Sequence, residues 1–274
     1  MEEEVSLVDT HCHLDAADFD ADRDGMVDAA RAAGVREIVV PSVERANFAA
    51  VASVCRDYAG CVPAYGIHPL AVERARPEDL DALRDRLCGE PAVAVGEIGL
   101  DRHVGAEGRD DDRQQFYFVE QLNLARQFGL PVLLHVRKAI DPILGQLRRA
   151  RVSGGIAHAF NGSRQQAEEF IKLGFKLGFG GAMTFGGSKR IRELATTLPL
   201  DSIVLETDAP DIPPAWKAGA RNTPADLLPI AEMLAKLRGL PLAELAAITR
   251  ANAVTALPRL AVFSNHNHNH RNQP

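Results

Sequence analysis

Short apolar runs rich in β-branched residues recur along the whole chain. Consecutive runs begin roughly 20 to 40 residues apart, which leaves room for a helix in each interval. Each run is short enough for one strand and is flanked by polar or turn-forming residues. The pattern therefore predicts eight strands, at Val5–Val8, Glu37–Val40, Val62–Tyr65, Ala92–Val95, Val132–Leu134, Gly155–Ala157, Phe175–Phe179 and Ser202–Leu205.

Several of the intervening segments repeat their apolar residues with the 3.6-residue period of a helix. One predicted stripe consists of Phe116, Val119, Leu122, Leu124 and Phe128, and another of Leu227, Ile230, Leu234 and Leu237. Helix-start residues agree with the pattern, since Ser163 precedes a predicted helix over Arg164–Leu173 and Pro77 opens one toward Leu87.

Eight strands that alternate with helices, several of them apolar on both faces, indicate an α/β protein with parallel strands covered on both sides. A single (β/α)₈ TIM barrel over residues 1–262 fits this pattern and the length of 274 residues. An open doubly wound sheet is the alternative. The segment Leu240–Leu257 predicts an extra C-terminal helix after the eighth unit.

Composition narrows the class of protein. The chain is 46% hydrophobic and 25% charged, which is typical of a globular domain. No apolar run reaches the ~18 residues of a membrane span, and the acidic start, Met1 to Glu4, is unlike a signal peptide. A cytoplasmic location is therefore expected. None of the usual phosphate-binding glycine motifs follows a strand, so no nucleotide cofactor is expected.

Charge and cysteine content exclude further classes. The net charge of −6 argues against broad adhesion to nucleic acid but leaves room for a local basic pocket. The four cysteines form no C-x-x-C pair, which argues against a zinc finger or a redox dithiol. The sequence does not indicate an oligomeric state.

The last residues need separate treatment, because histidine and asparagine alternate there without an apolar partner. His266, His268 and His270 belong to this stretch and account for three of the nine histidines. The pattern resembles an affinity tag, although a natural His-rich tail is the alternative, and residues 263–274 are predicted to form a disordered tail.

Polar side chains occur where the predicted strands end. His11 and His13 follow the first strand with the i, i+2 spacing that points both to one side. Other polar residues end the fourth, fifth, sixth and eighth strands: Glu97, His135, His158 and Asp208. In a barrel these ends share one rim, so six ligands would meet, enough for two ions. A carboxylate between ions ~3.5–4 Å apart would place a hydroxide for attack.

Each residue also has a simpler interpretation. A histidine at a strand end is commonly a hydrogen-bonded structural residue, and Asp208 before Pro210 can cap a helix. Glu97, after a buried run, needs a charged partner or a metal. His68 is either a packed histidine or a donor to a phosphate oxygen. Arg137 either binds phosphate or forms a salt bridge.

The order of the strand-end motifs resembles the TatD family of metal-dependent hydrolases, among the amidohydrolase-like TIM barrels. The G-E-I-G-L-D and E-T-D-A-P motifs are the specific ones, and D-x-H-x-H is shared by many amidohydrolases. The matching stretches, in the family's order, are Asp9–Asp15, Gly66–Pro69, Val95–Asp101, His135–Arg137, His158–Ser163 and Glu206–Pro210.

The resemblance implies a metal-dependent phosphodiesterase that acts on DNA as an exonuclease-like deoxyribonuclease. It assigns two divalent ions (Zn, Mn or Mg) to His11, His13, Glu97, His135, His158 and Asp208, with Glu97 bridging. Asp208 and Glu97 are the expected catalytic residues, and His68 and Arg137 the expected substrate-binding residues.

The chain departs from the family where R-G-x-x-N-E-P is common, because it carries Arg221-Asn222-Thr223-Pro224 there. This departure bears on the substrate rather than on the metals. Two other functions therefore stay open: a hydrolase of a small phosphoester, ester, lactone or amide, and a metal-binding protein without catalysis.

Overall fold

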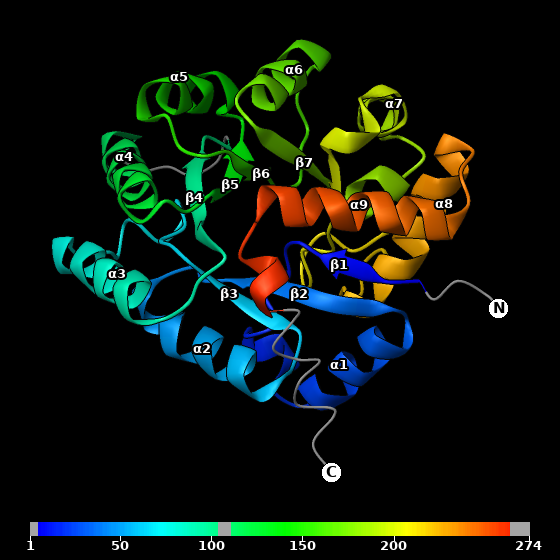
Figure 1. Cartoon of the computed structure of the whole chain (residues 1–274), viewed down its shortest axis with the longest axis horizontal. Helices are drawn as coiled ribbons and strands as arrows, with labels where there is room; N and C mark the ends of the chain where they lie inside the picture. Colours follow the sequence, from blue (N-terminus) through cyan, green and yellow to red (C-terminus); the bar gives the residue numbers. More distant parts are fainter. Residues whose placement is uncertain (1–4, 104–110, 264–274) are drawn as a thin grey trace.

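A computed structural model describes residues 5–103 and 111–263 of the chain. Its eight parallel strands pair in sequence order, β1 to β8, and surround the molecular centre (Figure 1). The strands are β1 (Leu7–Asp9), β2 (Val35–Pro41), β3 (Cys61–Tyr65), β4 (Ala94–Asp101), β5 (Val132–Arg137), β6 (Gly155–Ala157), β7 (Phe175–Phe179) and β8 (Ile203–Leu205). The predicted TIM barrel is confirmed.

Helices cover the outside of the strands, because each strand leads into a helix that packs back on the sheet (Figure 1). They are α1 (Arg23–Ala32), α2 (Phe48–Asp57), α3 (Pro77–Gly89), α4 (Asp111–Phe128), α5 (Ile140–Ala150), α6 (Arg164–Lys172), α7 (Lys189–Thr197), α8 (Leu227–Arg238) and α9 (Leu242–Ala256). As expected, Ser163 caps α6, since its hydroxyl accepts the backbone N–H of Gln166 at 3.2 Å.

Hydrogen bonds at the strand ends join β8 to β1 and complete the barrel. The backbone N–H of Thr10 donates to Leu205 at 3.1 Å. Just beyond the strands, the N–H of Asp208 donates to the carbonyl of His11, and that of His13 to Ala209, both at 2.8 Å. These bonds hold the loop after β8 against the loop after β1, and both loops carry predicted site residues.

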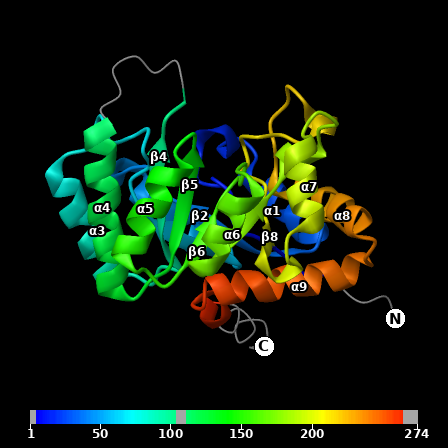
Figure 2. The same cartoon turned by 90° about the horizontal axis from the view of Figure 1, so that it is seen from above.

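The predicted C-terminal helix is present as α9, and it lies across the N-terminal ends of the strands (Figure 2). Its Ala253 and Ala256, together with Leu257 just after it, belong to a buried cluster with side chains inside the barrel, such as Val39 and Leu133. This end of the barrel is therefore filled with apolar side chains, and the opposite end, where the strands finish, is left for polar ones.

Two predictions about element detail were wrong. Phe116 was expected on the buried stripe of α4 but is 50% exposed, and Tyr117 and Phe118 are buried instead. The fourth strand was predicted at Ala92–Val95 with Glu97 at its end, but β4 spans Ala94–Asp101 and is buried throughout. Glu97 therefore lies inside a strand, whose backbone holds it more firmly than a loop would.

At the C-terminal end of the described chain, Phe263 packs against the cluster that contains Ala253 and Leu257. The rest of the predicted tail lies outside the described residues. Most of the acidic segment between His103 and Asp112 also lies outside them. Within the described ranges, no helix is both long and apolar enough to span a membrane.

Candidate metal centre

The carboxylate of Glu97 lies at the centre of the polar end of the barrel and is 2% exposed. Its Oε2 atom is 3.1 Å from Nε2 of His11 and 3.6 Å from Nε2 of His13. Its Oε1 atom is 2.9 Å from Nδ1 of His135 and 3.8 Å from Nε2 of His158. Nε2 of His68 also lies 3.5 Å from Oε1. The two carboxylate oxygens thus face separate sets of imidazoles, as the oxygens of a bridging carboxylate would.

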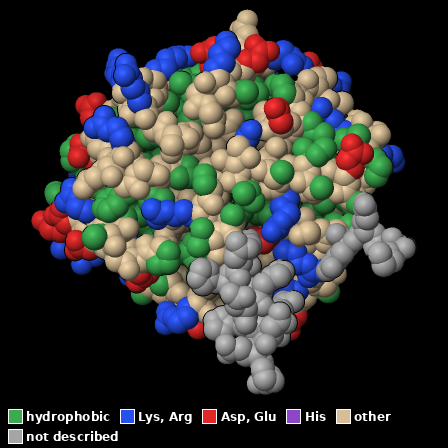
Figure 3. All heavy atoms as spheres, viewed as in Figure 1, with side chains coloured by type: hydrophobic (Ala, Val, Ile, Leu, Met, Phe, Trp, Pro, Cys, Tyr) green, Lys and Arg blue, Asp and Glu red, His purple; other side chains and the backbone are tan. Residues whose placement is uncertain are grey.

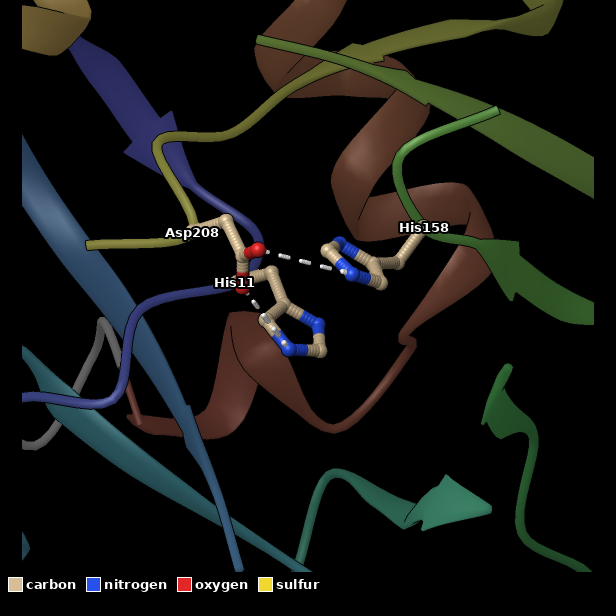
Figure 4. Close-up of side chains that lie close together, drawn as sticks. All are labelled: His11, His158 and Asp208. Atoms are coloured by element: carbon tan, nitrogen blue, oxygen red, sulfur yellow. Dashed lines mark ion pairs between the residues drawn. The ribbon is translucent and has the colours of Figure 1, made fainter. Parts of the chain in front are cut away.

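Asp208 completes the set from the loop after β8. Its Oδ1 atom is 3.7 Å from Nε2 of His11, and its Oδ2 atom is 3.8 Å from Nε2 of His158 (Figure 4). The helix-cap interpretation does not hold, because α8 begins only at Leu227. The structure therefore brings together all six residues that the sequence nominated.

Asp9 fixes the ends of β1 and β8 relative to each other. Its carboxylate accepts the hydroxyl of Thr207 at 2.6 Å and the backbone N–H of Thr207 at 2.9 Å. Burial raises the pKa of Asp9 to about 7, and the bonds from Thr207 offset part of that effect. Through this contact, His11 and Asp208 are held beside each other.

The charges of the cluster depend strongly on one another. Burial alone would raise the pKa of Glu97, yet His68 and His11 hold it well below its usual value. Burial would lower the pKa of His158, but Asp208 and Glu206 raise it to about 10. Burial raises the pKa of Asp208 to about 6. A buried set of this kind needs compensating positive charge, which protons or metal ions can supply.

Two further carboxylates lie behind the histidines that face Glu97 Oε1. Oδ2 of Asp101 is 3.2 Å from Nε2 of His135, and Oε1 of Glu206 is 3.2 Å from Nδ1 of His158. A carboxylate at one ring nitrogen keeps a proton there and leaves the other nitrogen's lone pair free for a metal. The ring nitrogen on the Glu97 side, Nδ1 of His135 and Nε2 of His158, is therefore the one that would bind an ion.

The sequence analysis did not single out Asp101 as a functional residue. The signal was available, because Asp101 follows Glu97 by four positions and positions i and i+4 share one face of a strand. Glu206 is accommodated by Gly178 on the neighbouring strand, where a Cβ atom would lie 2.0 Å from the Glu206 carboxylate.

The residues present fit divalent metal ions. Nε2 of His11 lies 3.3 Å from Nε2 of His13, and both nitrogens also face the Glu97 carboxylate. Three overlapping groups have their ligand atoms within 4.8 Å of one another: His11, His158 and Asp208; His11, His13 and Glu97; and His68, Glu97 and His135. Imidazole with carboxylate suits zinc and manganese, and carboxylate also suits magnesium.

His68 and Arg137 lie around this cluster. Nδ1 of His68 accepts the backbone N–H of Leu70 at 3.1 Å, so we infer that its proton is on Nε2, 3.5 Å from Oε1 of Glu97. His68 then offers a donor rather than a lone pair. The guanidinium of Arg137 is 3.9 Å from Oδ2 of Asp101, and its side chain is 51% exposed.

A cavity of about 930 Å³ opens over the cluster, and both His68 and Arg137 line it together with His103, Lys138 and Arg190. Two basic residues in the loop after β8 form ion pairs elsewhere. Arg221 pairs with Asp22 at 2.6 Å, and Lys217 pairs with Asp226 at 2.5 Å. The permanently charged basic side chains at the cavity therefore come from the end of β5, the residue after it and α7: Arg137, Lys138 and Arg190.

Comparison with known proteins assigns the family. The model of the TatD-related DNase family matches residues 8–258, almost the whole barrel. The chain belongs to this family. It is 39% identical to the uncharacterized metal-dependent hydrolase YjjV of Escherichia coli, over 91% of this chain and 96% of YjjV. The chain is thus a TatD-family metal-dependent hydrolase.

Two further comparisons support this assignment. The crystal structure of the YjjV TatD homologue from E. coli superposes with a TM-score of 0.89 at 37% identity and covers 93% of this chain and 99% of that one. The human deoxyribonuclease TATDN3 is 32% identical over 93% of this chain and 96% of its own length. The resemblance seen in the motifs is therefore confirmed at the level of the family.

Proposed function

We propose that this TatD-family hydrolase cleaves phosphodiester bonds in DNA, and that two divalent ions (Zn, Mn or Mg) support the reaction. The observation that carries the proposal is the position of Glu97, whose two oxygens face two separate sets of histidines. The ions would be held by His11, His13, Glu97, His135, His158 and Asp208. Such ions neutralise phosphate charge and lower the pKa of water.

The chain's own residues have distinct tasks in this proposal. Asp208 accepts the proton of the attacking water, because burial raises its pKa to about 6 and makes it a better base than an exposed aspartate. His68 donates its Nε2 proton in a hydrogen bond to a phosphate oxygen. Arg137 is exposed at the cavity and pairs with a second phosphate oxygen.

DNA is favoured as the substrate for two reasons. The human relative TATDN3 is named a deoxyribonuclease, and three permanently basic side chains, Arg137, Lys138 and Arg190, line the cavity despite the acidic chain. In a chain with a net charge of −6, these three side chains are positive groups at the cavity that can pair with phosphate oxygens.

The test uses protein from which the His-rich tail has been removed, because His266, His268 and His270 bind metal themselves. Chelated enzyme is mixed with labelled DNA and, separately, with a panel of small phosphoesters, carboxylic esters, lactones and amides. We expect DNA cleavage that EDTA abolishes and that Mn²⁺, Zn²⁺ or Mg²⁺ restores.

Glu97→Ala should lose this activity and retain at most one ion by elemental analysis, whereas Glu232→Ala, an exposed position on α8, should retain both. Cleavage of small esters or amides without cleavage of DNA would assign a small-molecule hydrolase instead. Full activity in metal-free enzyme would overturn the metal centre, and two retained ions in Glu97→Ala would overturn the bridge.

A further inference from the structure

Large apolar side chains are exposed beside the cavity, on two loops at the polar end of the barrel. The described part of the chain has six exposed large hydrophobic residues, and three of them occupy the loops after β7 and β8. These are Phe185, Ile212 and Trp216, which are 36%, 37% and 45% exposed. We call these three residues the rim platform. Water-exposed aromatic rings at the mouth of a site need an explanation in binding.

The two loops are joined to each other, so the platform has a defined shape. The backbone N–H of Ala215 donates to the hydroxyl of Thr184 at 2.7 Å. Gly181 packs so closely on the other loop that a Cβ atom there would lie 2.3 Å from the carbonyl oxygen of Ile212. In Figure 2 the loop after β8 rises beside the upper end of α7, at the polar end of the barrel.

Individual side chains of the platform are also held in place. The indole N–H of Trp216 donates to the carboxylate of Asp226 at 3.2 Å, although the ring remains nearly half exposed. Ile212 has a φ of +43°, a conformation that β-branched residues rarely adopt. The side-chain amide of Asn222 donates to the carbonyls of Asp211 and Ile212 and stabilises this turn. Strained, well-held residues of this kind gather at binding sites.

The platform is continuous with the cavity and has positive charge beside it. Ile212 and Arg190 both line the cavity, together with Ala182 from the loop after β7. Arg190 is oriented by Asn161, whose side-chain oxygen accepts from the guanidinium at 2.6 Å. A ligand that extends from the cavity over this rim therefore meets Arg190 and Ile212, and the two joined loops that form the rim also carry the exposed rings of Phe185 and Trp216.

We propose that the rim platform stacks the unpaired bases of a single DNA strand next to the phosphate that is cleaved. The inference rests on the proposed function and adds the form of the substrate and the residues that hold it. A phosphate contact at Arg190 with bases on Phe185 and Trp216 is the combination that single-stranded nucleic acid requires. Bases within a duplex are stacked on one another, so their faces are not free for these rings.

The test compares two single-stranded oligonucleotides of equal length on the full chain with metal. One carries normal bases, and the other carries abasic sugars at the positions that flank the cleaved bond. Wild-type enzyme should cleave the normal strand with a kcat/KM about 5- to 100-fold higher, because each stacked base contributes that order of affinity. Trp216→Ala and Phe185→Ala should reduce this preference toward one.

Two controls separate stacking from structural damage. Trp216→Phe removes the bond to Asp226 but keeps an aromatic face, so it should retain most of the preference. Phe116→Ala removes an exposed phenylalanine on α4, away from the cavity, and should behave as wild type. A variant that loses equal activity on both strands has a structural defect, which would overturn the role of that residue in stacking.

The outcomes distinguish this inference from the function on which it rests. If wild-type enzyme cleaves both strands equally, or if Trp216→Ala and Phe185→Ala retain the full preference, the stacking platform is wrong and the deoxyribonuclease activity stands. If wild-type enzyme cleaves neither strand, both proposals are overturned together.

Discussion

At the scale of single residues, Asp208 combines a backbone constraint with a chemical role. Its backbone has a φ of +60°, and its N–H donates to the carbonyl of His11. These two features place its carboxylate beside the imidazoles of His11 and His158. Burial raises its pKa to about 6, so it remains largely ionised at neutral pH and still accepts a proton readily.

Asp208→Asn should lower kcat by about 10²- to 10⁴-fold, the usual contribution of a general base. Asparagine keeps the size and one ligand oxygen but removes the proton acceptor, and KM should change little because binding rests on other groups. Steady-state kinetics and metal analysis on one preparation check this. Asp211→Asn, an exposed carboxylate at the same cavity, is the matched control. A near-normal kcat with both ions retained would remove Asp208 from the chemistry.

Glu206 acts at the same scale but through another residue. Its carboxylate lies 3.2 Å from Nδ1 of His158 and accepts the backbone N–H of Ala159 at 2.6 Å. Glu206→Gln should weaken metal affinity by about 10- to 100-fold, because the neutral amide holds the imidazole tautomer less firmly. Metal titration measures the effect, and Asp101→Asn provides the parallel test at His135. Unchanged affinity in both variants would show that these carboxylates only fill space.

At the scale of elements, the sequence predicted the order of strands and helices because burial on both faces leaves a simple apolar signature. The sequence also predicted the six residues of the candidate metal site, because polar residues such as His11 and Asp208 follow the apolar runs at the strand ends. It failed for Phe116, because the apolar period of α4 includes a position that the neighbouring elements do not cover. The partnership of Asp101 with His135 depends on how two strands align, which periodicity does not encode.

A substitution of Leu257 would test whether the apolar end of the barrel affects stability without affecting catalysis at the polar end. Leu257 is fully buried in the cluster beneath the strands, just after α9. Leu257→Ala should lower the free energy of unfolding by about 2–5 kcal/mol, because it leaves a cavity in a packed interior. The kcat should be unchanged at temperatures where the protein stays folded, since the catalytic groups lie at the opposite end.

Urea unfolding measures the stability of Leu257→Ala, with Thr255→Ala as an exposed control on α9 that should change it by less than about 0.5 kcal/mol. A loss below 1 kcal/mol would mean that α9 does not close the barrel tightly. A large fall in kcat without unfolding would mean that the two ends are coupled.

At the scale of the whole molecule, chemistry and stability occupy opposite ends of one barrel. The face that α9 covers shows interspersed acidic, basic and hydrophobic side chains (Figure 3). At the other end, four histidines and two carboxylates converge in a mostly buried space. Without ions, Nε2 of His11 and Nε2 of His13 lie 3.3 Å apart, and the carboxylates of Glu97 and Asp208 are buried beside them. Such a cluster lowers the stability of the fold until cations occupy it.

Metal should therefore stabilise the entire fold as well as support catalysis. A ligand that binds only the native state adds about 2.7 kcal/mol at 100 times its Kd, which corresponds to about 5 °C or more in Tm for a chain of this size. We expect tail-free, chelated protein to gain such a shift with Zn²⁺ or Mn²⁺, by calorimetry at several metal concentrations. Glu97→Ala should lose most of the shift, whereas Glu232→Ala should keep it. An equal shift in Glu97→Ala and wild type would place the stabilising ion outside the barrel's polar end.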